Sequence, residues 1–321
     1  MNSTIGRGTV NARAAPGGRI AVALRWWVAV QVVWLSSLGL LASTVHRTIP
    51  EAWLYPVLAD VVIGCTAIPL AIALRRPTPR VWLVAVVWLA AGAFIRVNEV
   101  AICLKVAAPD GFFGGSRPLA VSVVVFAALA NLATVVALCR QPLRGSMVGA
   151  VLAGAQPSRR QLWISRLIAV WAATQVGRFI ALGVIGDVLH RGDNPAWLAP
   201  ALGDLIVATP ALFVAFVLWT RRSPWVWVTT FVFYAISIVD HLDTITGDVR
   251  TPAPHTFASM STGSFPTWGT PLLQAVVDAV CLWALARTAM RRTYLQPTGR
   301  WMPNNSPKRS LPYVASKTTA R

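Results

Sequence analysis

Apolar residues along the chain form eight long blocks that are separated by shorter polar segments. A helix that crosses the hydrocarbon core of a bilayer needs about 20 predominantly apolar residues, and each block reaches about that length. The pattern therefore predicts an all-α integral membrane protein with eight transmembrane helices. The predicted spans are residues 20–44, 52–74, 81–104, 118–139, 166–189, 197–219, 225–243 and 269–290.

The basic residues lie mostly on one of the two sides that these spans define. Both chain ends and the even-numbered connections are rich in arginine, as in Arg75, Arg140, Arg159 and the segment 287–321. Cytoplasmic segments of membrane proteins carry an excess of Lys and Arg. Both the N- and the C-terminus are therefore expected to be cytoplasmic. The odd-numbered connections hold only Arg47, Lys105, Arg117, Arg191 and Arg250.

Composition excludes several classes of protein. The chain has 321 residues, of which 55% are hydrophobic and 12% charged, and its mean hydropathy is +0.59. These values exclude a water-soluble enzyme, a disordered protein and a secreted disulfide scaffold. The Lys and Arg residues responsible for the net charge of +18 lie between the apolar blocks. They therefore indicate the orientation of the chain in the membrane and contact with lipid headgroups, rather than binding of nucleic acid. Arginine outnumbers lysine 26 to 3, which is typical of a GC-rich genome and favours a bacterial cytoplasmic membrane.

The chain repeats itself. A shift of 144 residues aligns 27–74 with 171–218 without a gap, and 17 of these 48 pairs are identical. Shifts of 145 and 147 continue the match into the later spans, where Asn131 aligns with Asp278. The pattern predicts two tandem four-helix repeats, which are parallel because four is an even number of crossings. The expected segments are a disordered basic tail (1–18), the first repeat (19–140), a cytoplasmic linker (141–165), the second repeat (166–292) and a second disordered basic tail (293–321).

Several acidic residues fall within the predicted spans. A charged group at this depth is costly, so each one is a candidate functional residue. Asp60 and Asp204 are related by the repeat and lie about 12 Å from the outer side at 1.5 Å per residue. The candidate catalytic residues are Asp60, Asp204, Asp278, Glu99 and His241. We expect them to share one polar pocket at the junction of the two repeats.

Aromatic and amide side chains supply candidates for substrate binding. Tryptophan faces attract cations, and four tryptophans lie deep within predicted spans. The candidate binding residues are Trp34, Trp88, Trp171, Trp283, Gln31 and Gln175. Structural roles are open alternatives: the glutamines could form interhelical hydrogen bonds, and Asp60 and Asp204 could pair with Arg96 or Arg178. The outer connections 105–117 and 244–268 could be lids over the pocket or solvated loops.

These residue types fit acid-initiated chemistry on a lipophilic substrate. A carboxylic acid in apolar surroundings keeps its proton near neutral pH and can protonate an epoxide or an alkene. The small all-helical architecture with one key acid in each half, Asp60 and Asp204, resembles the membrane-integral terpene cyclases of meroterpenoid and indole-sesquiterpenoid pathways. The resemblance covers the spans in outline. It implies cyclisation of an epoxidised prenyl chain, with Asp60 and Asp204 as the acids.

No cofactor or metal is expected for this reaction. The chain has no DDxxD motif for Mg²⁺-assisted diphosphate ionisation, and its four cysteines lie inside apolar blocks without a CxxC pair. Asp240, Asp243 and Asp248 form only a faint aspartate-rich pattern. The expected partners are a lipophilic small molecule and membrane lipids, and the oligomeric state is open.

Two other functions remain open. Parallel repeats with membrane acids also suit a proton-coupled transporter, although Pro69 and Pro210 do not align and so mark no shared break in the spans. The third possibility is a non-catalytic membrane subunit whose acids pair with a partner protein.

Overall fold

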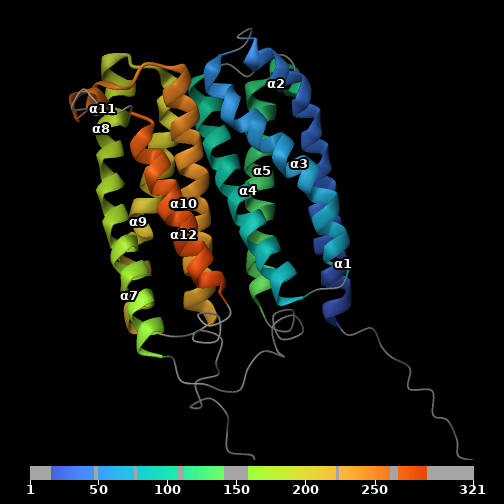
Figure 1. Cartoon of the computed structure of the whole chain (residues 1–321). Helices are drawn as coiled ribbons and strands as arrows, with labels where there is room; N and C mark the ends of the chain where they lie inside the picture. Colours follow the sequence, from blue (N-terminus) through green and yellow to red (C-terminus); the bar gives the residue numbers. More distant parts are fainter. Residues whose placement is uncertain are drawn as a thin grey trace, which may run out of the picture.

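A computed structural model describes residues 16–46, 50–75, 78–106, 112–140, 158–221, 224–260 and 267–287. All regular secondary structure in these ranges is helical, and the long helices run side by side as a bundle (Figure 1). Eight helical stretches within them are long and apolar enough to cross a membrane. The prediction of an all-helical protein with eight helical stretches long and apolar enough to cross a membrane is therefore confirmed.

The first four candidate spans occupy the half of the bundle drawn in blue to green in Figure 1. The first span is α1, η1 and α2 in succession, and the second begins with the short η2. These elements are α1 (Pro16–Val30), η1 (Gln31–Ser37), α2 (Leu38–Val45), η2 (Glu51–Trp53), α3 (Leu54–Ala73), α4 (Pro79–Lys105), η3 (Phe113–Gly115) and α5 (Arg117–Cys139).

The last four candidate spans occupy the other half, drawn in yellow-green to red-orange. The fifth span is again built from successive short elements, which end in the single π-helical turn η5. The elements are α7 (Arg159–Thr174), η4 (Gln175–Ile180), α8 (Ala181–Gly186), η5 (Asp187–Arg191), η6 (Pro195–Trp197), α9 (Leu198–Thr220), α10 (Pro224–Arg250), α11 (His255–Met260) and α12 (Gly269–Ala286).

Helices α1, α7 and α10 extend well beyond the predicted spans, and α1 begins at Pro16, so the end of the predicted disordered tail 1–18 is helical. Helix α7 begins at Arg159 because Ser158 and Gln161 form a capping box, so the end of the predicted linker 141–165 is helical. Helix α10 continues to Arg250, and α11 follows it, so the predicted outer loop 244–268 is partly helical. Hydropathy marks the apolar part of a helix and misses its polar ends, which is why these boundaries differ.

The first span of each half changes from α- to 3₁₀-helix at matching positions. Segment η1 begins at Gln31 and η4 begins at Gln175, and the 144-residue shift aligns these two glutamines. A 3₁₀ segment within a longer helix commonly marks a hinge or a functional site. Trp34 and Arg178, which the same shift aligns, both lie in these segments with buried side chains.

The two halves meet along α3 and α4 on one side and α9 and α10 on the other. The Tyr55 hydroxyl donates to the Val239 carbonyl at 2.8 Å, and Asn98 Nδ2 donates to Asp243 Oδ2 at 3.1 Å. The faces that point away from this junction carry exposed apolar side chains, including Phe126 (64%) and Phe213 (63%). Such faces suit lipid contact, because the helices satisfy their own backbone hydrogen bonds.

Gly203 allows α9 to approach its neighbours closely. A Cβ atom at this position would contact Asp240 Oδ1 of α10 and lie 2.9 Å from Phe94 Cζ of α4. Since a side chain here would overpack the junction, we expect Gly203→Ala to lower the free energy of unfolding by about 1–3 kcal/mol. Thermal unfolding of the purified protein measures this effect.

Gly39→Ala is the matched control, because a Cβ atom on Gly39 of α2 meets nothing within 4 Å. This variant is expected to unfold at or slightly above the wild-type temperature. Equal unfolding temperatures for Gly203→Ala and Gly39→Ala would contradict the close approach of α9, α10 and α4.

Candidate functional site

A cavity of about 600 Å³ lies within the second half of the bundle. Its walls come from α7 and η4 of the fifth span, from α9 and α10, and from α11 and α12. All of its lining residues lie between Trp171 and Gln274. The cavity is therefore not at the junction of the two halves, where the sequence analysis placed it.

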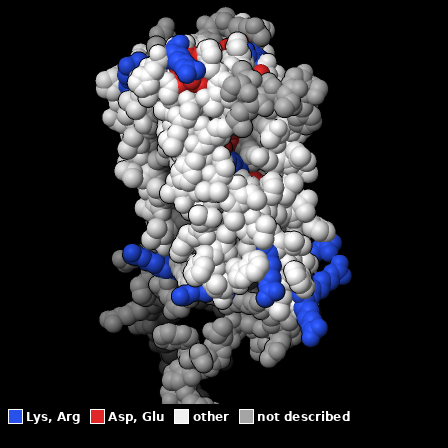
Figure 2. Space-filling model, turned by 90° about the vertical axis from the view of Figure 1, so that its left-hand side faces the viewer, with Lys and Arg blue, Asp and Glu red and all other residues white. Residues whose placement is uncertain are grey.

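The cavity opens on a side face of the bundle. Figure 2 shows this face, the left-hand side of Figure 1, as largely uncharged, with a hollow at mid-height that has basic and acidic atoms at its base. The Arg and Asp residues that line the cavity are Arg178, Asp204 and Asp248. Phe179, Leu182 and Leu272 expose apolar side chains on the neighbouring elements. The cavity is therefore open on a face of the bundle that carries exposed apolar side chains.

Arg178 from η4 lies at the centre of the site and is buried. Its guanidinium group has five N–H donors, and five side-chain atoms accept from it, so it offers no further N–H to a ligand. Arg178 is also the only Lys or Arg among the described lining residues. The acceptors are Gln175 Oε1 (2.7 Å from Nε), Asp204 Oδ1 and Asp240 Oδ2 (3.0 and 2.5 Å from Nη1), and Ser237 Oγ and His241 Nε2 (from Nη2).

These contacts determine where protons lie. Because arginine only donates, His241 Nε2 accepts with its lone pair, and the imidazole is neutral. Asp204 Oδ1 and Asp240 Oδ2 both accept from Nη1 of Arg178, so the two carboxyl groups lie close together. Two carboxyl groups at one site favour a proton on one of them, because like charges repel. The Asp240 side chain is fully buried, whereas that of Asp204 is 13% exposed and lines the cavity. The pair therefore holds a proton at the cavity wall.

Asp278 of α12 does not line the cavity. It accepts hydrogen bonds from Trp171 Nε1 at 2.6 Å and from Ser237 Oγ at 2.5 Å, and is fully buried. Its position in the first half is taken by Asn131, which accepts from Trp27 Nε1 at 2.9 Å. Asp278 thus holds the Trp171 indole against the cavity, as Asn131 holds Trp27.

The remaining acidic candidates form a closed cluster in the first half. Arg96 pairs with Asp60 and, at 2.5 Å, with Glu99, and its guanidinium carbon lies 3.7 Å from the centre of the Trp34 ring. Trp34 Nε1 in turn donates to Gln31 Oε1 at 2.8 Å. All five side chains are buried, and none of them lines the cavity. Asp60 therefore forms an ion pair with Arg96, which was the structural alternative to a catalytic role for this residue.

The buried arginine lies on a different span in each half: Arg96 is on the third span of the first half, and Arg178 is on the first span of the second half. The repeat aligns Trp34 with Arg178 on the first span of each half, and Arg96 with His241 on the third. In the first half the Trp34 indole lies under the guanidinium group and fills the space. In the second half the smaller imidazole of His241 faces Arg178, and the cavity lies beside them.

The other two tryptophan candidates lie outside the cavity. Trp88 Nε1 donates to Thr66 Oγ1 at 2.8 Å, away from the lining residues. Trp283 is 57% exposed and lies 3.6 Å below the guanidinium carbon of Arg287. Trp283 follows Asp278 by five residues, which turns it about 140° around the helix at 3.6 residues per turn. Depth within a span therefore did not indicate which face these residues occupy.

Sequence analysis missed a polar face of α12. Thr270 and Gln274 line the cavity together with Thr267, which precedes the helix. Their spacing of three and four residues places them on the same face as Asp278. The repeat aligns them with Ala120, Val123 and Ala127, which are apolar. Three polar residues at helical spacing in an apolar span, present in one repeat alone, are the signal that could have identified this wall.

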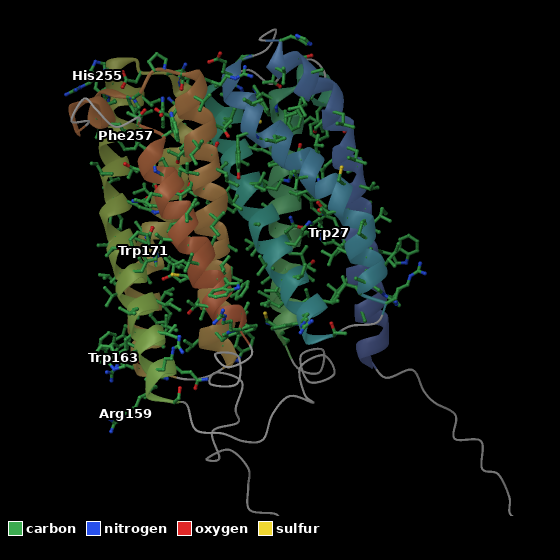
Figure 3. The ribbon with its side chains drawn as sticks, viewed as in Figure 1. Trp27, Arg159, Trp163, Trp171, His255 and Phe257 are labelled. Atoms are coloured by element: carbon green, nitrogen blue, oxygen red, sulfur yellow. The ribbon has the colours of Figure 1, made fainter. Side chains whose placement is uncertain are left out.

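Short helix α11 covers the outer end of the cavity. Asp187 accepts hydrogen bonds from the backbone N and the hydroxyl of Thr256, at 2.7 and 2.5 Å. Asp193 accepts from the backbone N of His255 at 2.9 Å and from its ring Nδ1 at 2.6 Å. These carboxylates satisfy N–H groups that the first turn leaves free. Phe257 on α11 lines the cavity, and Figure 3 places it near His255 at the end of the bundle, with Trp171 deeper.

No protein-family model, curated protein or solved structure matches this chain. Among the described residues, no group of three or more His, Cys, Asp or Glu side chains is arranged to hold a metal ion. The cavity and its carboxyl groups are therefore the features of the protein that bear on function.

Asp278 and Asn131 accept equivalent hydrogen bonds from Trp171 and Trp27, and this leads to a prediction. Asparagine at position 278 can still accept from Trp171 Nε1, as Asn131 accepts from Trp27. Asp278→Asn is therefore expected to unfold near the wild-type temperature. Asp278→Leu leaves the Trp171 and Ser237 donors without an acceptor and is expected to lower the free energy of unfolding by about 1–3 kcal/mol.

Thermal unfolding of both variants in one detergent checks this difference. Equal destabilisation by the two substitutions would mean that the charge of Asp278, rather than its acceptor oxygen, is what the fold requires.

Proposed function

We propose that this protein is an integral-membrane terpene cyclase that protonates the prenyl chain of a lipophilic substrate and so starts its cyclisation. One observation carries this proposal. The carboxyl group of Asp204, which shares Nη1 of Arg178 with the buried Asp240, faces a cavity of about 600 Å³ that opens on a side face of the bundle. The cavity falls within the size range of small-molecule sites.

The proposed reaction uses the side chains of the cavity wall. Asp204 donates its proton to the oxygen of an epoxide on the prenyl chain. The C–O bond breaks as a double bond of the same chain attacks, and the ring closes. Trp171, Trp197 and Phe257 present aromatic groups to the resulting cation. The final cation returns a proton to the Asp204–Asp240 pair, so the product is an isomer of the substrate.

The balance of buried charge supports proton storage at this depth. Six carboxyl groups lie within the spans in or near the two clusters, and only two guanidinium groups lie among them, while His241 is neutral. Charges without a partner are strongly disfavoured in apolar surroundings and are neutralised by protonation. The groups are Asp60, Glu99, Asp204, Asp240, Asp243 and Asp278, with Arg96 and Arg178.

A proton-coupled transporter is the second candidate. The 3₁₀ segments at Gln31–Ser37 and Gln175–Ile180 favour it, because interrupted helices in both repeats are common at transport sites. However, transport between two parallel repeats needs a site at their interface, and this cavity lies within the second half. The cyclase is therefore the better-supported function.

Within this proposal the protein consists of two parallel four-helix repeats with both termini in the cytoplasm of a bacterial cell. Matching contacts support the repeat: Trp82 Nε1 donates to the Leu138 carbonyl, and Trp227 Nε1 to the Leu285 carbonyl, both at 2.9 Å. Helices α1 and α7 also begin at the same end of the bundle (Figure 1).

This topology predicts which side of the membrane each connection faces. In a variant without its native cysteines, Arg191→Cys at the end of η5 is expected to react with a membrane-impermeant maleimide in intact cells. Arg221→Cys after α9 is expected to react only after the membrane is opened. The reverse pattern would contradict cytoplasmic termini.

The proposed acid predicts a difference between the two repeat-related aspartates. Asp204→Asn is expected to lower the rate of cyclisation by about a hundredfold or more, because it removes a general acid. Asp60→Asn is the matched control, since Asp60 lies in the closed Arg96 cluster away from the cavity. It is expected to keep most of the activity.

Membranes that contain each variant can be incubated with epoxidised farnesyl- and geranylgeranyl-arenes. Chromatography with mass spectrometry then detects a product of unchanged mass and new retention. Full activity of Asp204→Asn in correctly folded protein would refute Asp204 as the acid.

A further inference from the structure

The outer end of the cavity holds a carboxylate without a basic partner among the described residues. Asp248 of α10 lines the cavity and accepts a hydrogen bond from Thr267 Oγ1. Its carboxylate forms no ion pair within the part of the chain that the structure describes. The chain between Met260 and Thr267 has no Lys or Arg in its sequence. The negative charge of Asp248 is therefore available to a ligand.

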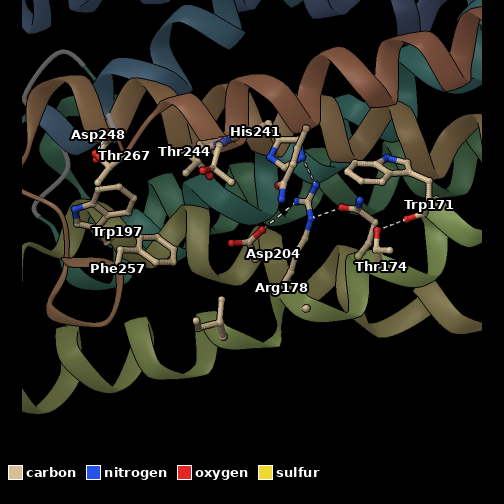
Figure 4. Close-up of a pocket in the computed structure, with 16 residues that line it drawn as sticks. Trp171, Thr174, Arg178, Trp197, Asp204, His241, Thr244, Asp248, Phe257 and Thr267 are labelled. Carbon is tan, nitrogen blue, oxygen red and sulfur yellow. Dashed lines mark hydrogen bonds and ion pairs between the residues drawn. The ribbon is translucent and has the colours of Figure 1, made fainter. Parts of the chain in front are cut away.

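Two aromatic rings lie at the same end of the cavity. The ring centres of Trp197 and Phe257 are 5.7 Å apart, with the rings nearly perpendicular. Trp197 Nε1 donates to the Pro252 carbonyl at 2.9 Å, which fixes the orientation of the indole. Figure 4 shows both rings near Asp248 and Thr267, with Trp171 toward the opposite end. A carboxylate beside aromatic faces is the environment that favours an ammonium group.

The rest of the cavity disfavours an anionic ligand. Arg178 is the only lining Lys or Arg among the described residues, and its five N–H groups already donate to protein side chains. The second lining carboxyl group, Asp204, supplies no positive charge. A phosphate or sulfate would thus meet the Asp248 carboxylate and no available cation.

We infer that the cavity takes a cationic amphiphile, with its ammonium group beside Asp248, Trp197 and Phe257 and its apolar chain directed toward Trp171. On α10, Asp248 follows His241 by seven residues, which puts the ammonium group about 10 Å from the Arg178 layer. Trp171 precedes Arg178 by seven residues and so lies about 10 Å deeper. The inference rests on the proposed function for the prenyl nature of the chain, whereas the binding of the ammonium group is independent of turnover.

Three probes with the same twelve-carbon chain test this inference. Dodecyltrimethylammonium, dodecanol and dodecyl sulfate are offered to the full-length protein in phosphatidylcholine nanodiscs. Equilibrium dialysis against empty nanodiscs subtracts partitioning into the lipid. We expect the ammonium probe to bind at least about tenfold more tightly than either of the other probes, since a hydrogen bond or ion pair to a charged group commonly has that effect.

Variants assign the effect to the outer end of the cavity. Asp248→Asn is expected to remove the advantage of the ammonium probe and to leave dodecanol binding unchanged. Glu51→Gln is the matched control, because this acid of η2 lies in the first half, away from the cavity. Phe257→Leu is expected to lower the affinity for the ammonium probe several-fold. This variant takes the place of Asp248→Asn in the test if Asp248→Asn does not fold.

Two results would overturn the inference: equal binding of the three probes by the wild type, or unchanged ammonium selectivity in folded Asp248→Asn and Phe257→Leu. Because no turnover is measured, loss of cyclisation alongside intact ammonium selectivity would reject the proposed function only. Cyclisation without ammonium selectivity would reject this inference only.

Discussion

A guanidinium group buried in the membrane interior must have all of its N–H groups satisfied and its charge balanced, and the second half of this protein is arranged around that requirement. Arg178 donates to its own segment through Gln175, to α9 through Asp204 and to α10 through Asp240. Ser237 accepts from Arg178 and donates to Asp278 of α12, so all four spans are joined through one residue. The same network leaves one carboxyl group, that of Asp204, facing an open space.

The two halves share a framework and differ in what fills it. Both have a 3₁₀ segment in the first span, an aspartate in the second and a tryptophan held from the fourth. The first half places Trp34 beneath Arg96 and is filled, whereas the second half places Arg178 against the smaller His241 and has polar residues on α12. The first half is thus packed and the second half contains a cavity, so the aligned acids Asp60 and Asp204 lie in different surroundings.

Much of the fold could be predicted from the sequence, because membrane-crossing length and apolar composition are properties of continuous segments. Asp204, His241, Trp171 and Gln175 were among the candidate residues from the sequence, and all of them line the cavity. The location of the cavity could not be predicted, since it depends on side-chain volumes at Trp34 and His241 and on the 3₁₀ turn that directs Arg178 inward. Trp283 shows the same limit. It lies within its predicted span, but on the face of α12 that points out of the bundle.

If the cavity is the substrate site, a lipophilic chain occupies the second half of the bundle and not the closed first half. A photoreactive prenyl-arene with a diazirine near the chain end tests it directly, when it is cross-linked to the protein in nanodiscs and located by peptide mass spectrometry. The account predicts labels on peptides that contain Trp171 to Ile180 and Thr267 to Gln274, and competition by unlabelled substrate. Labels concentrated around Asp60 and Arg96, or spread evenly over the outward faces of all eight spans, would contradict it.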